Sequence, residues 1–207
     1  MTVTRRIGLI GGTFDPVHIA HLHIAACVLA ELALDEVRFI PAGNPPHKPG
    51  RPISDAADRL RMLEIATHGI EGLAVDPIDL RGEAPSYTSE LLERIHVTDP
   101  GAELWFIVGG DSLAELHTWH RPDRVIELAR LAVAERPGWS IDHALATSPV
   151  AGLRERVDAF SSVPIDLSAS LIRERISTGL PVDWVVPAAV LRYIADHRLY
   201  GKRAELR

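Results

Sequence analysis

The chain has 207 residues, a length that suits a single domain spanning 1–207, and its 46% hydrophobic and 24% charged residues are ordinary for a globular protein. The net charge of −6 excludes a general binder of polyanions, so we expect no nucleic-acid partner. No apolar run approaches the roughly 20 residues of a membrane span, and the first residues lack a secretory signal, which predicts a cytoplasmic protein without a membrane partner.

Short apolar runs alternate with helical patterns along the chain. The expected strands are 7–10, 37–40, 73–75, 104–108, 131–134 and 157–160, and the expected helices are 18–33, 54–68, 88–97, 122–129, 168–178 and 187–196. The alternation predicts an α/β fold, a Rossmann-like doubly wound parallel sheet with helices on both faces and a small C-terminal helical part at about 165–200. Ligands of such sheets bind beyond the carboxyl ends of the strands, so functional residues should follow strands. Residues 136–156 give no readable pattern.

The first strand is followed by the run 11–21 (GGTFDPVHIAH). Its two glycines allow a tight turn close to a ligand, and we expect Asp15 to cap the following helix with Pro16 at the first helical position. A helix start offers N–H groups and the positive end of a dipole to anions. His18 and His21 are three residues apart and share the face beside it. The run indicates a phosphate site; a metal site on the histidine pair and ordinary surface histidines are the alternatives.

The next residues of this helix are expected to be structural. His23 lies off the shared face. Cys27, the single cysteine, sits in the apolar run 24–34 with no local base, which favours a small buried side chain over a nucleophile. The helix 54–68 is expected to begin with Ser54 as its N-cap.

Four further segments follow strands or open helices. They are the proline-rich loop 41–52, Ser-Tyr-Thr at 86–88, Gly-Gly-Asp-Ser-Leu at 109–113 with Trp119 beyond it, and Ser-Ala-Ser-Leu-Ile-Arg at 168–173. Taken alone, several of their residues have structural explanations: a solvated loop lysine for Lys48, a helix cap for Thr88, a core residue for Trp119 and a surface arginine for Arg136. Ser170 and Arg173 are three residues apart, so both can face a phosphate at a helix start.

The run 11–21 resembles the signature of the nucleotidylyltransferase superfamily, Gly-Gly-x-Phe-Asp-Pro-x-His-x-Gly-His, and departs from it at Ala20, whose methyl group falls close to where the superfamily holds the nucleotide. The segment 168–173 is similar to the superfamily's Ile-Ser-Ser-Thr-x-Ile-Arg, with Leu167, Ala169 and Ser170 as departures. The remaining segments resemble one branch, the bacterial nicotinate-nucleotide adenylyltransferases, and this similarity extends from about residue 6 to 200.

The resemblance implies transfer of AMP from ATP to nicotinate mononucleotide in NAD biosynthesis, with pyrophosphate released. The implied catalytic residues are His18, His21, Lys48 and Arg173. The implied ATP contacts are Gly11, Gly12, Thr13, Phe14, His18, His21, Gly109, Asp111, Arg136, Ser168, Ser170 and Arg173. The implied contacts of nicotinate mononucleotide are Thr13, Asn44, His47, Lys48, Tyr87, Thr88 and Trp119. Mg²⁺ is implied as a cofactor carried on the ATP phosphates, with no metal ligand from the protein.

The residue set also favours a mechanism. It contains no serine with a base and no activated cysteine, so we expect direct in-line attack of the mononucleotide's phosphate on the α-phosphorus of ATP. The implied catalytic side chains, together with Ser170 and the N–H groups at helix starts, would compensate charge on the transition state. Lys48 would act as a mobile cation over the triphosphate. Asp111 would accept ribose hydroxyls, and Trp119 would stack on the pyridine ring.

Alternative functions stay open from the sequence. Nicotinamide mononucleotide and phosphopantetheine are the other candidate acceptors. The sequence does not decide between the acid, nicotinate mononucleotide, and the amide, nicotinamide mononucleotide. A dehydrogenase is disfavoured because Gly-x-Gly-x-x-Gly is absent after the first strand. A non-catalytic nucleotide-binding regulator is disfavoured because His18, His21 and Lys48 are all present. The oligomeric state is open, and a homo-oligomer is compatible with the sequence.

Overall fold

The computed structural model describes residues 4–44, 53–81, 86–135 and 138–201. Its centre is a six-stranded sheet in the order β3-β2-β1-β4-β5-β6. The strands are β1 (Arg6–Gly12), β2 (Glu36–Pro41), β3 (Leu73–Val75), β4 (Glu103–Val108), β5 (Arg130–Ala134) and β6 (Val157–Phe160). Every neighbouring pair is parallel, so the predicted parallel sheet and the position of each predicted strand are confirmed.

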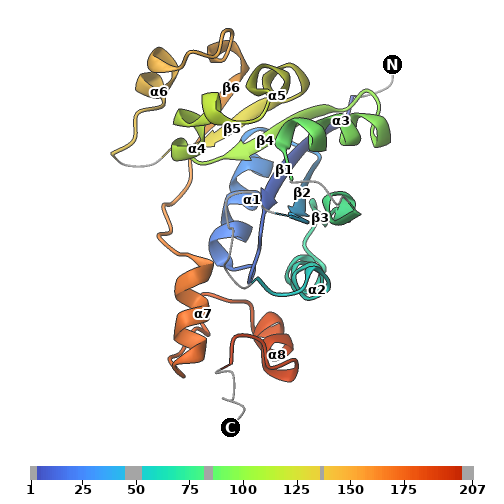
Figure 1. The fold of residues 1–207 in the computed structure, drawn as a ribbon, viewed down its shortest axis with the longest axis vertical. Coiled ribbons are helices and arrows are strands. Elements are labelled where there is room, and N and C mark those ends of the chain that lie inside the picture. Colours follow the sequence, from blue (N-terminus) through green and yellow to red (C-terminus); the bar gives the residue numbers. More distant parts are fainter. Residues whose placement is uncertain (1–3, 45–52, 82–85, 136–137, 202–207) are drawn as a thin grey trace.

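The helices follow the predicted alternation. They are α1 (Ile19–Glu31), α2 (Ala56–Thr67), α3 (Thr88–Thr98), α4 (Gly110–Ala114), α5 (Pro122–Leu128), α6 (Ile141–Thr147), α7 (Ala169–Ser177) and α8 (Ala188–Asp196), with 3-10 turns at Pro77–Arg81, Leu116–Thr118 and Arg154–Arg156. The short helices α4 and α6 were not predicted, and α6 lies in the stretch without a readable pattern. Figure 1 shows α7 and α8 next to each other at one end of the molecule, in the C-terminal part where helices were expected.

The sheet buries apolar side chains on both faces, because successive residues of a strand point to opposite sides. Ile7 and Leu9 of β1 join a core that includes residues of α3, α4 and α5. Ile10 joins a second core that includes residues of α1, α2, α7 and α8. Helices therefore cover both faces, and the predicted doubly wound arrangement is confirmed.

The strand order fixes where a ligand can bind. The chain runs outward from β1 through β2 to β3 and then returns to the other side of β1 to form β4. The strands that follow β1 in the chain are therefore placed first on one side of β1 and then, from β4 on, on the other side. At such a topological switch point the carboxyl ends of the two adjacent strands, here β1 and β4, flank a crevice. The runs 11–21 and 109–113 begin at these two strand ends.

The start of α1 differs from the prediction. His18, in extended backbone conformation, is the N-cap residue, so the expected cap at Asp15 and first helical position at Pro16 are wrong. The carboxylate of Asp15 turns inward instead, where it accepts a hydrogen bond at 2.6 Å from the hydroxyl of Tyr200. Because the partner of Asp15 lies so far along the chain, no local sequence pattern indicates this bond.

The start of α2 is also displaced from the prediction. Asp55 is the N-cap residue and Ser54 is not. The backbone N–H of Ser54 donates to a carboxylate oxygen of Asp15 at 3.3 Å, which joins the start of α2 to the turn before α1.

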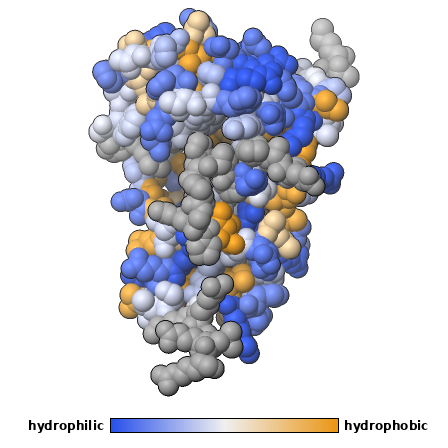
Figure 2. Space-filling model, viewed as in Figure 1, coloured by the Kyte–Doolittle hydropathy of each residue, from blue (hydrophilic) through white to orange (hydrophobic). Residues whose placement is uncertain are grey.

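The surface is mixed in character. On the face shown in Figure 2, hydrophobic residues appear as separate small groups among hydrophilic ones. Among the described residues, no helix combines the length and the hydrophobicity of a membrane span.

Candidate active site

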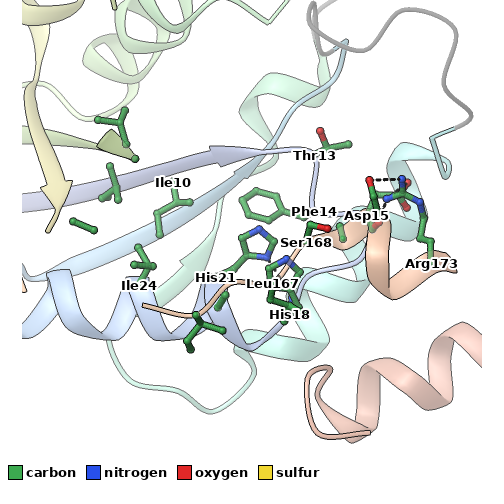
Figure 3. Close-up of a pocket in the computed structure, with 18 of the residues that line it drawn as sticks. Ile10, Thr13, Phe14, Asp15, His18, His21, Ile24, Leu167, Ser168 and Arg173 are labelled. Atoms are coloured by element: carbon green, nitrogen blue, oxygen red, sulfur yellow. Dashed lines mark hydrogen bonds and ion pairs between the residues drawn. The ribbon is translucent and has the colours of Figure 1, made fainter. Parts of the chain in front are cut away.

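A cavity of about 400 Å³ opens at the switch point between β1 and β4. Its walls come from the strand ends of β1, β4 and β5, the first turn of α1 and the start of α7, as Figure 3 shows in part. Eight of the residues implied as ATP contacts line it: Thr13, Phe14, His18, His21, Gly109, Ser168, Ser170 and Arg173. The volume lies within the range of small-molecule sites, roughly 300 to 1,000 Å³.

The turn after β1 depends on glycine and on a buried aromatic ring. A side chain at Gly12 would place its Cβ 2.9 Å from the ring of Phe14, closer than real Cβ atoms come. Phe14 itself has φ of 51°, which is uncommon for a residue with a side chain. Its ring is 3% exposed and packs edge-on against Phe39 and His21, with ring centroids 5.7 and 5.0 Å away. This packing holds the backbone of the turn against the cavity.

His18 and His21 lie together at the start of α1, as their spacing predicts. Their ring centroids are 3.7 Å apart with 22° between the planes. The backbone N–H of His18 donates to Nδ1 of His21 at 3.3 Å, so a neutral His21 carries its proton on Nε2. Figure 3 shows the two rings side by side, near Phe14 and Leu167.

His18 is the more buried of the two rings. It is 3% exposed, and burial lowers its pKa from 6.5 to about 4, so the ring is neutral at pH 7. Its buried Nδ1 makes no hydrogen bond with any described residue. Unpaired buried polar atoms are rare because they cost stability, and they are retained mostly where function needs them.

Backbone N–H groups at the start of α1 are less available to bind an anion than expected. The N–H of Ile19 donates to the carbonyl of Val185 at 3.0 Å, and that of His21 donates to the carbonyl of His18 at 3.0 Å. These donors are therefore already used within the protein. The side chains of the site must do more of the work of holding an anion.

The start of α7 presents an arginine to the cavity. Nη2 of Arg173 donates to Oγ of Ser170 at 3.2 Å, and Nη1 donates to the carbonyl oxygen of Asp15 at 2.6 Å. Ser168 is the N-cap residue, and its Oγ accepts from the N–H of Leu171 at 3.2 Å. Arg173 thus lies beside the turn at the edge of the cavity, and Ser168 has a structural role as well (Figure 3).

Other implied ATP contacts lie around the cavity or outside the described residues. Gly11 and Gly12 form the end of β1 without lining the cavity. Asp111 is exposed at the start of α4, and its carboxylate folds back over Gly109, where an added Cβ would lie 2.4 Å from Oδ1. Arg136, His47 and Lys48 lie outside the described residues.

The implied mononucleotide contacts form a second group near the start of α3. The N–H of Asn44 donates to Oγ of Ser86, and the N–H of Ser86 donates to the carbonyl of Asn44, each at 3.1 Å. Tyr87 is the N-cap residue of α3 and Thr88 is its first residue. The loop after β2 and the start of α3 are thereby joined.

Trp119 belongs to the same side of the sheet. Its ring meets that of Phe106 edge-on, with centroids 6.1 Å apart, and Phe106 lies 3.2 Å from where a Cβ on Gly11 would be. His120, the next residue, packs on the ring of Tyr87 with centroids 4.5 Å apart. Through Phe106, Trp119 therefore packs beside the end of β1.

Arg59 is a site residue that sequence reasoning missed. It is 2% exposed, and its guanidinium donates to the carbonyl oxygens of Thr13 at 3.0 Å and Ser54 at 3.1 Å. A sequence signal exists, because Arg59 falls on the same face of α2 as the buried Met62 and Leu63. A charged residue on a buried face needs a partner, but the sequence does not identify it.

Asp79 is a second missed residue, at the entry to the loop after β2. It is 4% exposed, pairs with Arg94 of α3 and accepts a hydrogen bond from the N–H of Gly43 at 3.2 Å. A Cβ on Gly43 would lie 2.5 Å from the carbonyl oxygen of Asp79, so the close approach requires glycine. Asp79 thus fixes the backbone next to Asn44.

Cys27 corrects one expectation. It does have a nearby base, because Nε2 of His23 lies 3.6 Å from Sγ. Burial, together with the charge of Glu31, raises the pKa of the thiol. A raised pKa keeps the sulfur protonated, so the pair is not an activated nucleophile.

The described residues contain no cluster of side chains suited to bind a metal ion. Among the described ranges, no group of three or more His, Cys, Asp or Glu side chains is placed to hold one. The histidine pair at the start of α1 has no third ligand beside it there.

Comparison with known proteins gives a consistent family. The family model described as cytidylyltransferase-like matches residues 9–175. A protein of Thermomicrobium roseum, named probable nicotinate-nucleotide adenylyltransferase, is 44% identical over 94% of this chain and 91% of its own length. One of Chromobacterium violaceum with the same name is 42% identical over 94% of this chain and 98% of its own.

Solved structures agree at the level of the fold. The nicotinic acid mononucleotide adenylyltransferase of Plasmodium falciparum, determined in complex with NaAD, superposes with a TM-score of 0.74 at 16% identity. The superposition covers 95% of this chain and 97% of that one.

Proposed function

Because the chain belongs to the nicotinate-nucleotide adenylyltransferase family, within the cytidylyltransferase-like proteins, we propose that it transfers AMP from ATP to nicotinate mononucleotide, a step of NAD biosynthesis. The products are nicotinate adenine dinucleotide and pyrophosphate. The observation that carries the proposal is the pair of stacked histidines, which lines one cavity with Arg173 at the topological switch point. This placement suits a phosphorylated substrate.

The two groups of residues suit two substrates. We assign ATP to the cavity, with its phosphates toward His18, His21, Ser170 and Arg173 and its ribose toward Gly109 and Asp111. We assign nicotinate mononucleotide to the side of Asn44, Tyr87, Thr88 and Trp119, with Thr13 in the turn between the two. His47, Lys48 and Arg136 complete these assignments from segments outside the described residues.

The reaction is a single displacement. An oxygen of the mononucleotide's 5′-phosphate forms a bond to the α-phosphorus of ATP, and the bond from that phosphorus to the bridging oxygen of the β-phosphate breaks. The leaving pyrophosphate takes the electron pair, and no covalent enzyme intermediate is needed. Positioning and stabilisation of charge then supply most of the catalysis.

His18 and Arg173 have distinct roles in this scheme. Arg173 is permanently charged and can donate to two phosphate oxygens at once. His18 is neutral in the free protein, and the negative charge of a bound triphosphate favours its protonated form. Charge on the protein would therefore increase when substrate arrives.

Mg²⁺ enters this proposal as part of the substrate MgATP. The lining of the cavity includes Arg173, hydroxyls and imidazoles, which suit phosphate oxygens. Asp15 is the one carboxylate among the described lining residues, and its two oxygens already accept hydrogen bonds from Tyr200 and Ser54. We further propose that the protein acts in the cytoplasm as a single domain of 1–207, without nucleic acid or membrane. A homo-oligomer remains compatible with this scheme.

The test is pyrophosphate release by the purified protein. Separate reactions contain MgATP with nicotinate mononucleotide, nicotinamide mononucleotide or phosphopantetheine, and a parallel set replaces ATP with CTP. We expect rapid release with ATP and nicotinate mononucleotide only. Release mainly with another acceptor would keep the mechanism and refute the assignment of Tyr87, Thr88 and Trp119. No release from protein that binds ATP would favour a non-catalytic regulator.

A further inference from the structure

Asp15, in the turn before α1, is a buried carboxylate held from the far end of the chain. It is 2% exposed, and the hydroxyl of Tyr200 donates to its Oδ1 at 2.6 Å across 185 residues of sequence. The N–H of Ser54 donates to Oδ2 at 3.3 Å. Tyr200 follows α8 and has φ of 63°, so its backbone adopts an uncommon conformation where the side chain reaches this carboxylate.

Arg173 stands next to the same carboxylate but does not pair with it closely. Its Nη1 is 3.9 Å from Oδ2 of Asp15, and the same nitrogen donates instead to the backbone oxygen of Asp15 at 2.6 Å. Its Nη2 donates to Ser170, and the side chain lines the cavity. A guanidinium beside a carboxylate normally forms two parallel hydrogen bonds with it, and that geometry is absent here.

The other nearby cation does not account for this arrangement. The charge of Arg59 interacts with that of Asp15, but its guanidinium donates its hydrogen bonds to the carbonyl oxygens of Thr13 and Ser54. The phenol of Tyr200 is held as a donor, since burial and the neighbouring carboxylate both raise its pKa. The side-chain hydroxyl that satisfies Asp15 is therefore that of Tyr200, as far as the described residues go.

We propose that Tyr200 is a positioning residue for Arg173. By occupying Oδ1 of Asp15, its hydroxyl prevents a close ion pair between Asp15 and Arg173 and leaves the guanidinium available to phosphate oxygens in the cavity. Without that hydroxyl, the buried carboxylate lacks its shortest hydrogen bond and attracts Arg173 away from the nucleotide. The inference rests on the proposed function, because it assumes that the cavity holds ATP.

The chain provides a matched control. Tyr193 of α8 donates to Oδ1 of Asp58 at 2.7 Å, a second tyrosine–aspartate bond, which joins α8 to α2. Tyr193→Phe removes that bond without touching the turn or the cavity. A role of Tyr200 in stability alone would make Tyr200→Phe and Tyr193→Phe similar in turnover.

The experiment measures kcat, the KM of each substrate and the melting temperature for the wild type and both variants. Tyr200→Phe should lower kcat/KM for ATP about tenfold, the effect of one lost charge-assisted contact, while the KM of the acceptor stays within twofold. Tyr193→Phe should leave both within twofold. Equal kinetics for the two variants would overturn the inference, whereas an inactive wild type would overturn the proposed function first.

A second comparison uses Asp15→Asn, whose neutral amide attracts Arg173 far less. In that background the additional change Tyr200→Phe should alter kcat/KM for ATP less than twofold. This comparison also decides the question if Tyr200→Phe alone fails to fold, because both proteins compared carry the neutral residue. A tenfold loss in the Asp15→Asn background would show that Tyr200 does not act through the carboxylate.

Discussion

The imidazole rings of His18 and His21 lie nearly parallel, with centroids 3.7 Å apart, and the backbone N–H of His18 donates to Nδ1 of His21. Two stacked imidazoles this close cannot both carry charge at low cost, because like charges repel and the inner ring is buried. The free protein meets this constraint with a neutral His18. A bound phosphate changes the balance, so the pair can respond to the substrate's charge.

The first prediction concerns acid stability. The pKa of His18 is about 4 in the folded protein against 6.5 as the unperturbed value, so the unfolded chain binds the proton more tightly. Protons therefore favour unfolding between pH 6.5 and pH 4, and at pH 5 this group lowers the free energy of unfolding by about 2 kcal/mol. Urea unfolding at pH 7 and pH 5 should show His18→Asn losing about 2 kcal/mol less than the wild type.

The control for acid stability is His23→Asn, because His23 lies on the same helix away from the pair. Because that substitution leaves the His18–His21 pair intact, its loss of stability between pH 7 and pH 5 should still include the contribution of about 2 kcal/mol from His18. If His18→Asn matches the wild type, His18 is not held neutral in the folded protein.

The second prediction concerns turnover. His18→Ala should lower kcat by a factor of about 10² to 10³, the usual effect of deleting one donor to a transition-state oxyanion. The melting transition should stay cooperative, because the truncation also removes an unpaired buried nitrogen. Steady-state kinetics and thermal melting of the same preparation separate the two effects. Loss of turnover only in proportion to loss of folded protein would assign His18 a structural role.

The third prediction tests the location of ATP. Ala20 lines the cavity, and the larger side chain of Ala20→Leu would occupy space that we assign to the nucleotide. The KM of ATP should rise about tenfold or more, since overlap with a bound ligand costs at least 1.4 kcal/mol. Ala26→Leu, on the exposed face of the same helix, is the control. An unchanged KM of ATP in Ala20→Leu would place the nucleotide elsewhere.

Much of the fold was readable from the sequence because strands and helices have local periodicities. The strands β3 and β6 have the predicted bounds, and α8 begins one residue after the predicted start. The order of the strands was not readable, since it depends on contacts between distant segments. The short helix α6 was missed because seven residues carry too little periodicity.

The site was predictable where residues follow strands and not where they act at long range. His18 and His21 follow β1, and Gly109 follows β4; they line one cavity because the carboxyl ends of these neighbouring parallel strands meet at one edge of the sheet. The expected cap at Asp15 failed because its carboxylate has a better partner 185 residues away. Long-range bonds of this kind leave no pattern in a single sequence.

The fourth prediction concerns the single cysteine. The thiol of Cys27 lies 3.6 Å from Nε2 of His23, yet burial and Glu31 raise its pKa. Because the thiolate is the reactive form, the folded protein should react with a disulfide reagent at pH 7.5 more slowly than the unfolded chain. Fast labelling of folded protein would mean that His23 activates the sulfur.

The last prediction concerns the mononucleotide side of the site. Asp79 holds the N–H of Gly43 and pairs with Arg94, so it fixes the backbone next to Asn44, which we assign to the acceptor. Asp79→Asn retains an acceptor for the N–H but loses the charge that holds Arg94. We expect the KM of nicotinate mononucleotide to rise about fivefold to tenfold, as for one weakened contact, while the KM of ATP changes less than twofold.

Asp99→Asn is the matched control, because Asp99 forms a comparable ion pair with Arg38, at 2.7 and 2.9 Å, away from the Gly43 turn. That variant should lose stability through the broken pair and leave both KM values within twofold, since neither residue is near an assigned substrate. Melting temperatures of the two variants show whether a loss of stability alone changes the KM values. If Asp79→Asn raised both KM values equally, or neither, the entry to this loop would not position the acceptor.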